Sequence, residues 1–390
     1  MLDIFLNLIL SVMIILLLVM VFYQYFLVAV YSWYRKTEIY SSTVDFNFQI
    51  LIPAHNEEKI IEDTLREIKK IDYPKEKYDV TVIVDNSSDG TINIVKSFGI
   101  NFLERVDVAN VGKSFALDWA LREMDLDGVD AIVVIDADTK VSPNLLTTFN
   151  KYLNNGFDCV QCANLVNRLQ EGPLVSLFAL GNVMKNYYVY YPKFKLGSSA
   201  LLLGTGMCFK SSLINEYLQE TYSISEDIEF SLKLIRKGDH IAFAHETFVE
   251  ALYPENLRGA TTQRTRWGSG TFILIKKFFP FFLIRGIIEK RFLYIDTALT
   301  LLTWSKPIMG VTFICSLILS LFTCTYLYYI ALGLAFAELC YFTLGICLLI
   351  HLRYKWKSII WSPFLAFWFI FVTIKSLLGY DSKKWKKTER

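Results

Sequence analysis

The sequence predicts a soluble α/β domain flanked by membrane-spanning segments, and three observations point to it. Apolar residues make up 53% of the 390 residues. The mean hydropathy of +0.35 is too high for an ordinary soluble protein and too low for a chain made only of membrane spans. Long uncharged runs lie near both ends, and residues 45–260 alternate short β-type runs with helical stretches. A net charge of +2 gives no reason to expect a nucleic-acid partner.

Residues 1–34 are expected to form an N-terminal transmembrane anchor. The run from Ile4 to Tyr34 carries no charge and exceeds the roughly 20 residues that a span needs. Asp3 precedes this run and Arg35 and Lys36 follow it, which is the reverse of a signal peptide, so the segment should be retained. The basic pair predicts that the following domain is cytoplasmic.

Residues 45–260 are expected to form the cytoplasmic domain. Nearly continuous apolar runs are typical of parallel strands that are covered on both faces, and they occur at Phe48–Ile52, Val80–Val84, Ala131–Ile135 and Phe157–Cys162. Helical patterns occur at Glu57–Lys70 and Lys113–Met124. Cys159 and Cys162 have no second Cys/His pair to complete a zinc site, so we expect reduced core thiols.

The C-terminal part is expected to return to the membrane. Residues 261–304 are basic and amphipathic, which predicts helices on an anionic membrane surface. Residues 305–380 should form the C-terminal transmembrane region, with two helices joined near residues 323–326. The shorter segment 358–374 either crosses the membrane or lies in its interface; the charges favour the interface, which keeps the basic tail 381–390 in the cytoplasm.

Acidic residues follow two of the predicted strands. Asp85 ends one, and Asp136 ends another, with Asp138 two residues later. Ligands of open α/β sheets bind beyond the carboxyl ends of the strands, so these acids should meet in one crevice. Paired carboxylates can hold Mg²⁺ or Mn²⁺ together with substrate phosphates, although Asp-x-Asp alone also occurs in ordinary turns.

Two later motifs allow a structural and a functional interpretation. Ser225 is a candidate N-cap, and acids in a first helical turn complement the helix dipole, which explains Glu226 but leaves Asp227 open as a base. The segment from Gln263 to Trp267 is either a membrane-interface anchor or part of a site.

The order of these motifs resembles the membrane-integrated family 2 glycosyltransferases, which include cellulose, chitin, hyaluronan and poly-N-acetylglucosamine synthases. The resemblance covers roughly residues 45–275 and the flanking spans. It is carried by Asn56-Glu57, Asp85, Gly112-Lys113, Asp136-x-Asp138, Ser225-Glu226-Asp227 and Gln263-x-x-Arg266-Trp267. The sequence departs from the family pattern at Asn86, where many members have a second aspartate, and at Ser225, where threonine is usual.

The resemblance implies a cytoplasmic, Rossmann-like GT-A domain in a multi-pass protein of the cell membrane. It implies a nucleotide-sugar donor, with a UDP-sugar favoured, Mg²⁺ or Mn²⁺, and transfer with inversion to a glycan or lipid-linked acceptor. The favoured function is extension of a polysaccharide coupled to its export. Accessory export proteins are possible partners. Two alternatives stay open: transfer of one sugar to a lipid or carrier, and a transporter or scaffold with an inactive domain.

The resemblance also assigns residues. Ala54, Glu57 and Asp85 match the nucleotide pocket, where an acid accepts the N3–H of uracil. Lys113 would lie beside the donor, Asp136 near the ribose or diphosphate, and Asp138 on the metal. Asp227 matches the general base, whose pKa burial or neighbouring Glu226 should raise.

The remaining assignments concern the acceptor. Gln263, Arg266 and Trp267 match the motif that holds the acceptor and the diphosphate. The Gly204-Thr205-Gly206 turn resembles the one that receives the terminal sugar of the acceptor. The end of the tail, from Trp385 to Arg390, resembles a gating segment of hyaluronan-type synthases with stretched spacing.

Overall fold

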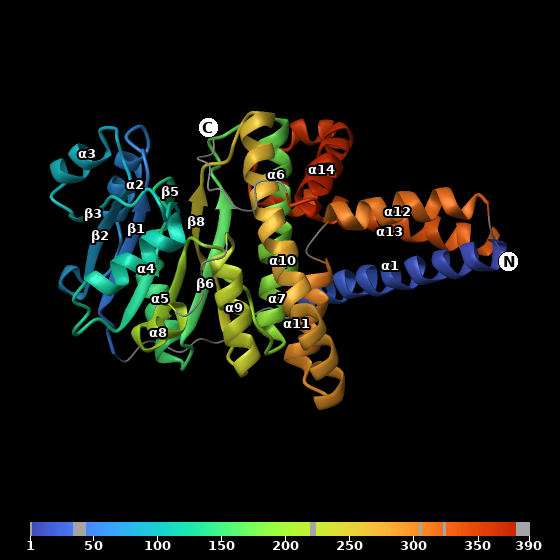
Figure 1. Cartoon of the computed structure of the whole chain (residues 1–390), viewed down its shortest axis with the longest axis horizontal. Helices are drawn as coiled ribbons and strands as arrows, with labels where there is room; N and C mark the ends of the chain where they lie inside the picture. The colour runs from blue at the N-terminus through green and yellow to red at the C-terminus, as the bar shows by residue number, and fades with distance from the viewer. Residues whose placement is uncertain (1, 34–43, 219–223, 304–305, 323–324, 380–390) are drawn as a thin grey trace.

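The computed structural model describes residues 2–33, 44–218, 224–303, 306–322 and 325–379 (Figure 1). The strands are β1 Phe48–Ala54, β2 Tyr78–Asp85, β3 Asn101–Arg105, β4 Ala131–Val134, β5 Thr139–Val141, β6 Cys159–Val166, β7 Met207–Lys210 and β8 Ile241–Ala251. The helices are α1 Leu2–Trp33, α2 Ile61–Ile68, α3 Thr91–Ser97, α4 Lys113–Glu123, α5 Leu145–Asn154, α6 Pro173–Lys185, α7 Tyr191–Lys195, α8 Ile214–Leu218, α9 Glu226–Lys237, α10 Leu257–Glu289, α11 Phe292–Thr303, α12 Lys306–Ser320, α13 Thr325–His351 and α14 Ser362–Leu377. Short 3₁₀ turns lie at Lys75–Lys77, Ser211–Leu213 and Lys357–Trp361, and a π-helical turn, Asn186–Tyr190, separates α6 from α7.

The strands form one sheet in the order β3-β2-β1-β4-β7-β6-β8-β5 (Figure 1). The first four are parallel neighbours, and Ile50 of β1 lies opposite Val80 of β2 and Val133 of β4. Ile50 and Val133 are fully buried, as expected for strands covered on both faces. Because these four strands run in the same direction, the residues that follow them gather at one edge of the sheet.

Strand β7 makes the sheet mixed, since it runs antiparallel between β4 and β6. Its beginning therefore lies at the edge where the parallel strands end. The backbone N–H of Gly206, just before β7, donates to the carbonyl oxygen of Val134 at the end of β4 over 2.9 Å. This antiparallel connection places the Gly204–Gly206 turn beside Asp136 and Asp138.

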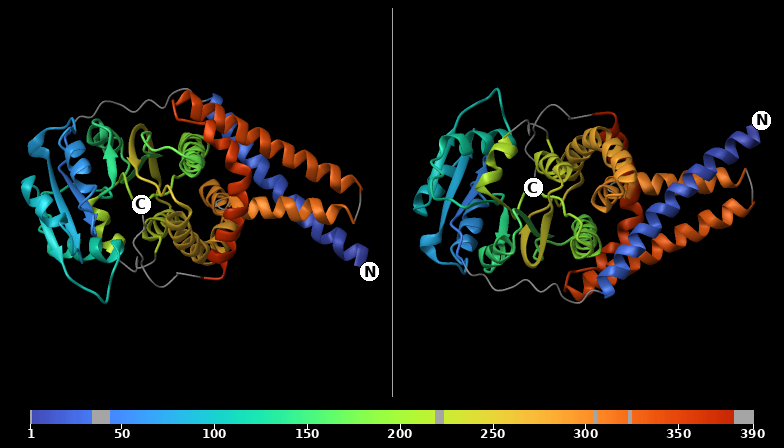
Figure 2. Two further views of the ribbon diagram at one scale, coloured as in Figure 1. Left: turned by 90° about the horizontal axis from the view of Figure 1, so that it is seen from above. Right: turned by 90° about the horizontal axis from the view of Figure 1, so that it is seen from below.

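Helices α6, α10 and α14 lie between the sheet and a bundle of α1, α12 and α13, which extends away from the sheet (Figures 1 and 2). The three bundle helices contact one another, and α14 crosses the base of the bundle while packing on α10. Hydrogen bonds join α14 to α10: the Ser269 hydroxyl donates to the Ser376 carbonyl oxygen over 3.1 Å, and the Ser376 hydroxyl donates to the Thr265 carbonyl oxygen over 3.3 Å. The Trp368 indole also donates to the Thr261 hydroxyl over 2.8 Å.

Two segments of the described residues are long and apolar enough to cross a membrane, Ile4–Trp33 in α1 and Tyr326–His351 in α13. The apolar parts of α12 and α14 are shorter, Met309–Ser320 and Phe367–Leu377. The Arg35–Lys36 pair and the tail 381–390, on which the predicted orientation depends, lie outside the described residues.

The structure differs from the sequence prediction in several boundaries. The helix expected at Glu57–Lys70 begins only at Ile61. Glu57 lies before the helix, where its backbone N–H donates to the Thr91 hydroxyl over 2.8 Å. The boundary expected between residues 260 and 261 falls inside α10. That helix begins at Leu257, where the Asn256 side chain caps it by accepting from the Gly259 N–H over 2.7 Å.

Candidate active site

A cavity of about 700 Å³ lies at the edge of the sheet where β1, β2 and β4 end, and it continues to α10 and α14. Almost every residue assigned to the site from the sequence lines it. These are Ala54, Glu57, Asp85, Lys113, Asp136, Asp138, Gly204, Thr205, Glu226, Asp227, Gln263, Arg266 and Trp267.

Gly206 is the exception, because it packs behind the cavity. A Cβ there would lie 2.4 Å from the Cys162 Sγ and 2.9 Å from Val249, at a φ of +62°. Gly206 therefore allows β6, β7 and β8 to approach closely. Gly204 does face the cavity: a Cβ there would lie 3.2 Å from Asp227 Oδ2 and 3.4 Å from Lys113 Nζ.

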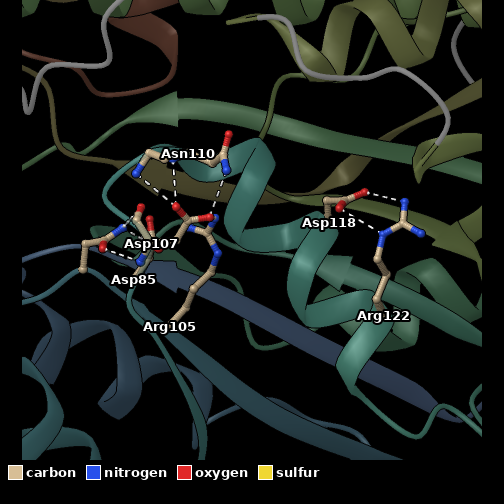
Figure 3. Close-up of polar contacts among 8 residues, drawn as sticks. Asp85, Arg105, Asp107, Asn110, Asp118 and Arg122 are labelled. Atoms are coloured by element: carbon tan, nitrogen blue, oxygen red, sulfur yellow. Dashed lines mark hydrogen bonds and ion pairs between the residues drawn. The ribbon is translucent and has the colours of Figure 1, made fainter.

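Asp85 lies at the end of β2 in a buried charge network (Figure 3). The Arg105 guanidinium donates to Asp85 Oδ1 over 2.7 Å and to Asp107 over 2.8 Å. Asn86 Nδ2 donates to the same Asp85 oxygen over 3.0 Å and adopts a left-handed backbone with a φ of +47°. Asparagine tolerates that conformation well, so the departure at Asn86 fits the local backbone.

Lys113 lines the cavity at the start of α4. Its ammonium group forms an ion pair with Asp136 and donates to the Gly204 carbonyl oxygen over 2.5 Å. Burial opposes the positive charge, but Asp136, Glu226 and Asp227 outweigh it and raise the pKa of Lys113. Lys113 therefore stays charged and links the end of β4 to the Gly204–Gly206 turn.

Asp138 is the candidate metal ligand. Asp138 is 7% exposed, and the Thr139 hydroxyl donates to its carboxylate over 3.2 Å. Within the described residues there is no cluster of three His, Cys, Asp or Glu side chains suited to a metal. One carboxylate that faces a cavity fits a Mg²⁺ or Mn²⁺ ion that takes its other oxygens from substrate phosphates and water.

Glu226 and Asp227 begin α9, and both have raised pKa values. Burial and the charge of Asp227 raise the pKa of Glu226 to about 8. Burial, aided by Asp136, raises the pKa of Asp227 to about 6, while a backbone hydrogen bond from Ile228 and the charge of Lys113 act against it. Burial is thus the main cause for Asp227, rather than the neighbouring Glu226.

Ser225 occupies the N-cap position of α9, as expected, but its hydroxyl makes no cap hydrogen bond. The Ile228 N–H instead donates to Asp227 Oδ1 over 2.8 Å. Ser225 is buried against α10, where a Cβ on Gly270 would lie 2.4 Å from the Ser225 Oγ. Close packing between α9 and α10 therefore decides the position of Ser225.

The motif from Gln263 to Trp267 lies on α10 and forms the far wall of the cavity. The Trp267 ring lies edge-on to Tyr253, with ring centroids 6.5 Å apart. Gln263 is 5% exposed, and its Oε1 has no hydrogen-bond donor among the described residues. A buried amide oxygen without a donor at a cavity wall is suited to a ligand hydroxyl.

Sequence reasoning missed several cavity residues. Lys185 at the end of α6 and Arg264 on α10 both line the cavity. The signal for Lys185 was its position as the one charge in the apolar stretch Pro173–Lys185. Phe369, Val372 and Ser376 of α14 also line the cavity, but their segment was interpreted only as a membrane element.

The fold and the site together define a glycosyltransferase of the GT-A type. The chain belongs to the family described as glycosyltransferase like family 2, whose model matches residues 46–270. The chain is 29% identical to the probable glycosyltransferase YdaM of Bacillus subtilis, over 87% of this chain and 86% of that protein. It is 24% identical to the poly-beta-1,6-N-acetyl-D-glucosamine synthase of Staphylococcus epidermidis, over 82% of this chain and 78% of that protein.

A solved structure supports the fold over nearly the whole chain. The mannosyltransferase PcManGT from Pyrobaculum calidifontis, in complex with GDP-Man and Mn²⁺, superposes with a TM-score of 0.62. The superposition covers 95% of this chain and 100% of that chain at 19% sequence identity. The α/β GT-A class predicted from the sequence is therefore confirmed.

Proposed function

We propose that this glycosyltransferase transfers a sugar from a nucleotide-sugar donor to extend a polysaccharide at the cell membrane. The donor that we favour is a UDP-sugar, and the transfer inverts the anomeric carbon. The main support is the joint placement of Asp138, Asp227 and Arg266 in one cavity. These three residues supply a metal ligand, a base and a phosphate-binding cation, which are the groups that such a transfer requires.

The donor would bind with its nucleotide at the Asp85 end of the cavity and its diphosphate near Lys113, Asp138 and Arg266. A Mg²⁺ or Mn²⁺ ion on Asp138 would offset negative charge on the departing diphosphate. Arg266 can donate two parallel hydrogen bonds to phosphate oxygens, which stabilises the same charge. Lys113 is held by Asp136 and Gly204, so its charge is already in position.

Asp227 would accept the proton of the acceptor hydroxyl while that oxygen attacks the anomeric carbon from the face opposite the leaving group. A base with a pKa of about 6 is ionised at neutral pH and is stronger than an ordinary aspartate. Attack opposite the leaving group inverts the anomeric carbon. Glu226, whose pKa lies near 8, would remain protonated beside it and donate rather than accept a hydrogen bond.

Extension of a polymer is supported by the similarity to poly-beta-1,6-N-acetyl-D-glucosamine synthase. The alternative, transfer of one sugar to a lipid or carrier, is supported by the few long apolar helices among the described residues. In either case we propose a multi-pass protein with α1 and α13 in the membrane and the sheet in the cytoplasm. The transverse position of α14 supports an interfacial rather than a spanning location (Figure 2).

A donor screen tests this function. Purified full-length protein in detergent is incubated with UDP-N-acetylglucosamine, UDP-glucose or GDP-mannose, and nucleotide release and product mass are measured. We expect release from one UDP-sugar and a ladder of products that differ by one sugar mass. A single added sugar would favour the alternative, and absence of release from every donor would support an inactive scaffold or transporter.

A further inference from the structure

Lys185 and Arg264 form a pair of positive charges in the cavity that the proposed transfer leaves unused. Lys185 ends α6 immediately before the π-helical turn Asn186–Tyr190, and Arg264 lies two turns into α10. Neither side chain forms an ion pair with an acid among the residues that the structure describes, and the buried Nε of Arg264 has no acceptor there. π-Helical turns occur often at functional sites.

The two charges disfavour each other. Burial and the charge of Arg264 lower the pKa of Lys185 to about 8, although Asp227 acts in the opposite direction. Burial also lowers the pKa of Arg264. Removing like charges from water without a counterion is unfavourable, so a bound anion would relieve this arrangement.

Aromatic rings fix the orientation of Arg264. Its guanidinium carbon lies 4.1 Å from the centre of the Phe178 ring and 4.9 Å from that of Trp267. A guanidinium stacked in this way keeps its N–H donors at its edge, where they can bind two oxygens of a phosphate. The site is therefore rigid on the Arg264 side.

The position of the pair points to the acceptor rather than to the donor. Lys113 and Arg266, with a metal on Asp138, would already offset the diphosphate of the donor. Lys185 and Arg264 come from α6 and α10, the layer between the sheet and the helix bundle (Figure 1). The same cavity is bounded by the apolar side chains of Phe369 and Val372 from α14.

Resting on the proposed function, the geometry points to a phosphate group on the acceptor, bound between Lys185 and Arg264, with the adjoining apolar part of the acceptor along α14. The phosphate belongs either to a lipid headgroup or to a phosphorylated, water-soluble acceptor. In both cases it would anchor the acceptor while Asp227 takes the proton of the hydroxyl that attacks the donor.

Equilibrium binding tests this site without turnover. The probes are hexyl phosphate and inorganic phosphate, titrated into full-length protein in an uncharged detergent at pH 7. Lys185→Gln and Arg264→Gln should each weaken hexyl phosphate binding roughly 10-fold or more, the range for a charged hydrogen bond. Lys185→Arg should retain binding, and Lys151→Gln, which removes an exposed lysine of α5, should leave it unchanged.

The same variants are titrated with UDP and Mn²⁺, whose affinity should change by less than about 2-fold. Tighter binding of hexyl phosphate than of inorganic phosphate would identify a lipid headgroup, and equal affinities a phosphate on a water-soluble acceptor. Absence of phosphate binding, binding unaffected by Lys185→Gln and Arg264→Gln, or an equal loss of UDP affinity would overturn the proposal. Failure of the proposed function would instead appear as absence of nucleotide release in the donor screen.

Discussion

Arg105 donates to Asp85 Oδ1 over 2.7 Å, and their side chains are only 6% and 5% exposed. Asn86 donates to the same oxygen, so the hydrogen bonds seen among the described residues leave Asp85 Oδ2 as the oxygen available to a nucleotide base in the cavity. The ion pair thus fixes the carboxylate that the family resemblance assigns to base recognition. Arg105 therefore helps to hold Asp85 in place at the end of the cavity that is assigned to the nucleotide.

Arg105→Gln should destabilise the protein by about 3–5 kcal/mol, because it leaves a buried carboxylate without its cation. Arg122→Gln is the matched control, since Arg122 is 55% exposed and pairs with Asp118 one turn away on α4 (Figure 3). Its loss should cost about 1 kcal/mol or less. The measurement is the free energy of unfolding in detergent, and equal losses in the two variants would contradict the buried ion pair.

The turnover number should fall as the pH drops through about 6. Asp227 acts as a base only when deprotonated, and burial places its pKa near that value. Glu226 has a pKa of about 8 and is therefore protonated throughout this range. In Glu226→Gln, the pH midpoint of this fall in turnover number should move by less than about half a pH unit. A larger downward shift would mean that a charged Glu226 raises the pKa of Asp227.

Trp267→Ala should impair use of the acceptor while sparing the donor. The Trp267 ring lines the cavity beside Tyr253 and Arg264, where it can stack on a sugar. We expect a higher acceptor KM or shorter products, with UDP affinity unchanged. Trp361→Ala, at an exposed aromatic residue before α14, serves as the control for membrane anchoring. An identical phenotype in both variants would support the anchoring interpretation of Trp267.

Gly206→Ala should reduce stability rather than specifically raise the acceptor KM. Its added Cβ would lie 2.4 Å from Cys162 Sγ, so strands in the core must move apart. Gly197→Ala is the control, because Gly197 has a similar φ of +71° with nothing within 4 Å of its Cβ. Thermal unfolding should show a larger loss for Gly206→Ala. Equal melting temperatures with a selective rise in acceptor KM would instead place Gly206 at the acceptor.

The parallel half of the sheet could be predicted because its strands are apolar on both faces. Asp85 and Asp136 end two of these strands. Because parallel strands end at the same edge of the sheet, the pattern also predicted that the two acids lie at one edge. Strand β5, which has three residues, and β7, which has four, are too short to show a period, so these two strands and their antiparallel pairing were not predicted. Cys159 and Cys162 are free and buried, as expected from their lack of partners.

The residues that sequence reasoning missed depend on tertiary contacts. Arg105 ends β3, and nothing in the sequence indicates that its guanidinium reaches Asp85 on the neighbouring strand. Lys185 lines the cavity at the end of α6, just before a π-helical turn that the sequence does not indicate. Ser225 occupies the N-cap position that its residue type predicts, but its hydroxyl lies against Gly270 of α10 and makes no cap hydrogen bond, which the sequence does not indicate.

The most direct test of the account compares donor affinity with turnover in Asp138→Ala and Asp227→Asn. UDP affinity is measured by titration with and without Mn²⁺, and nucleotide release is measured with the best donor. Asp138→Ala should lose the Mn²⁺-dependent part of UDP affinity together with turnover. Asp227→Asn should keep UDP affinity within about 3-fold while turnover falls by roughly 10²–10⁴, the usual loss for a general base. Normal turnover in Asp227→Asn, or Mn²⁺-dependent binding that survives Asp138→Ala, would contradict the assignment of base and metal ligand.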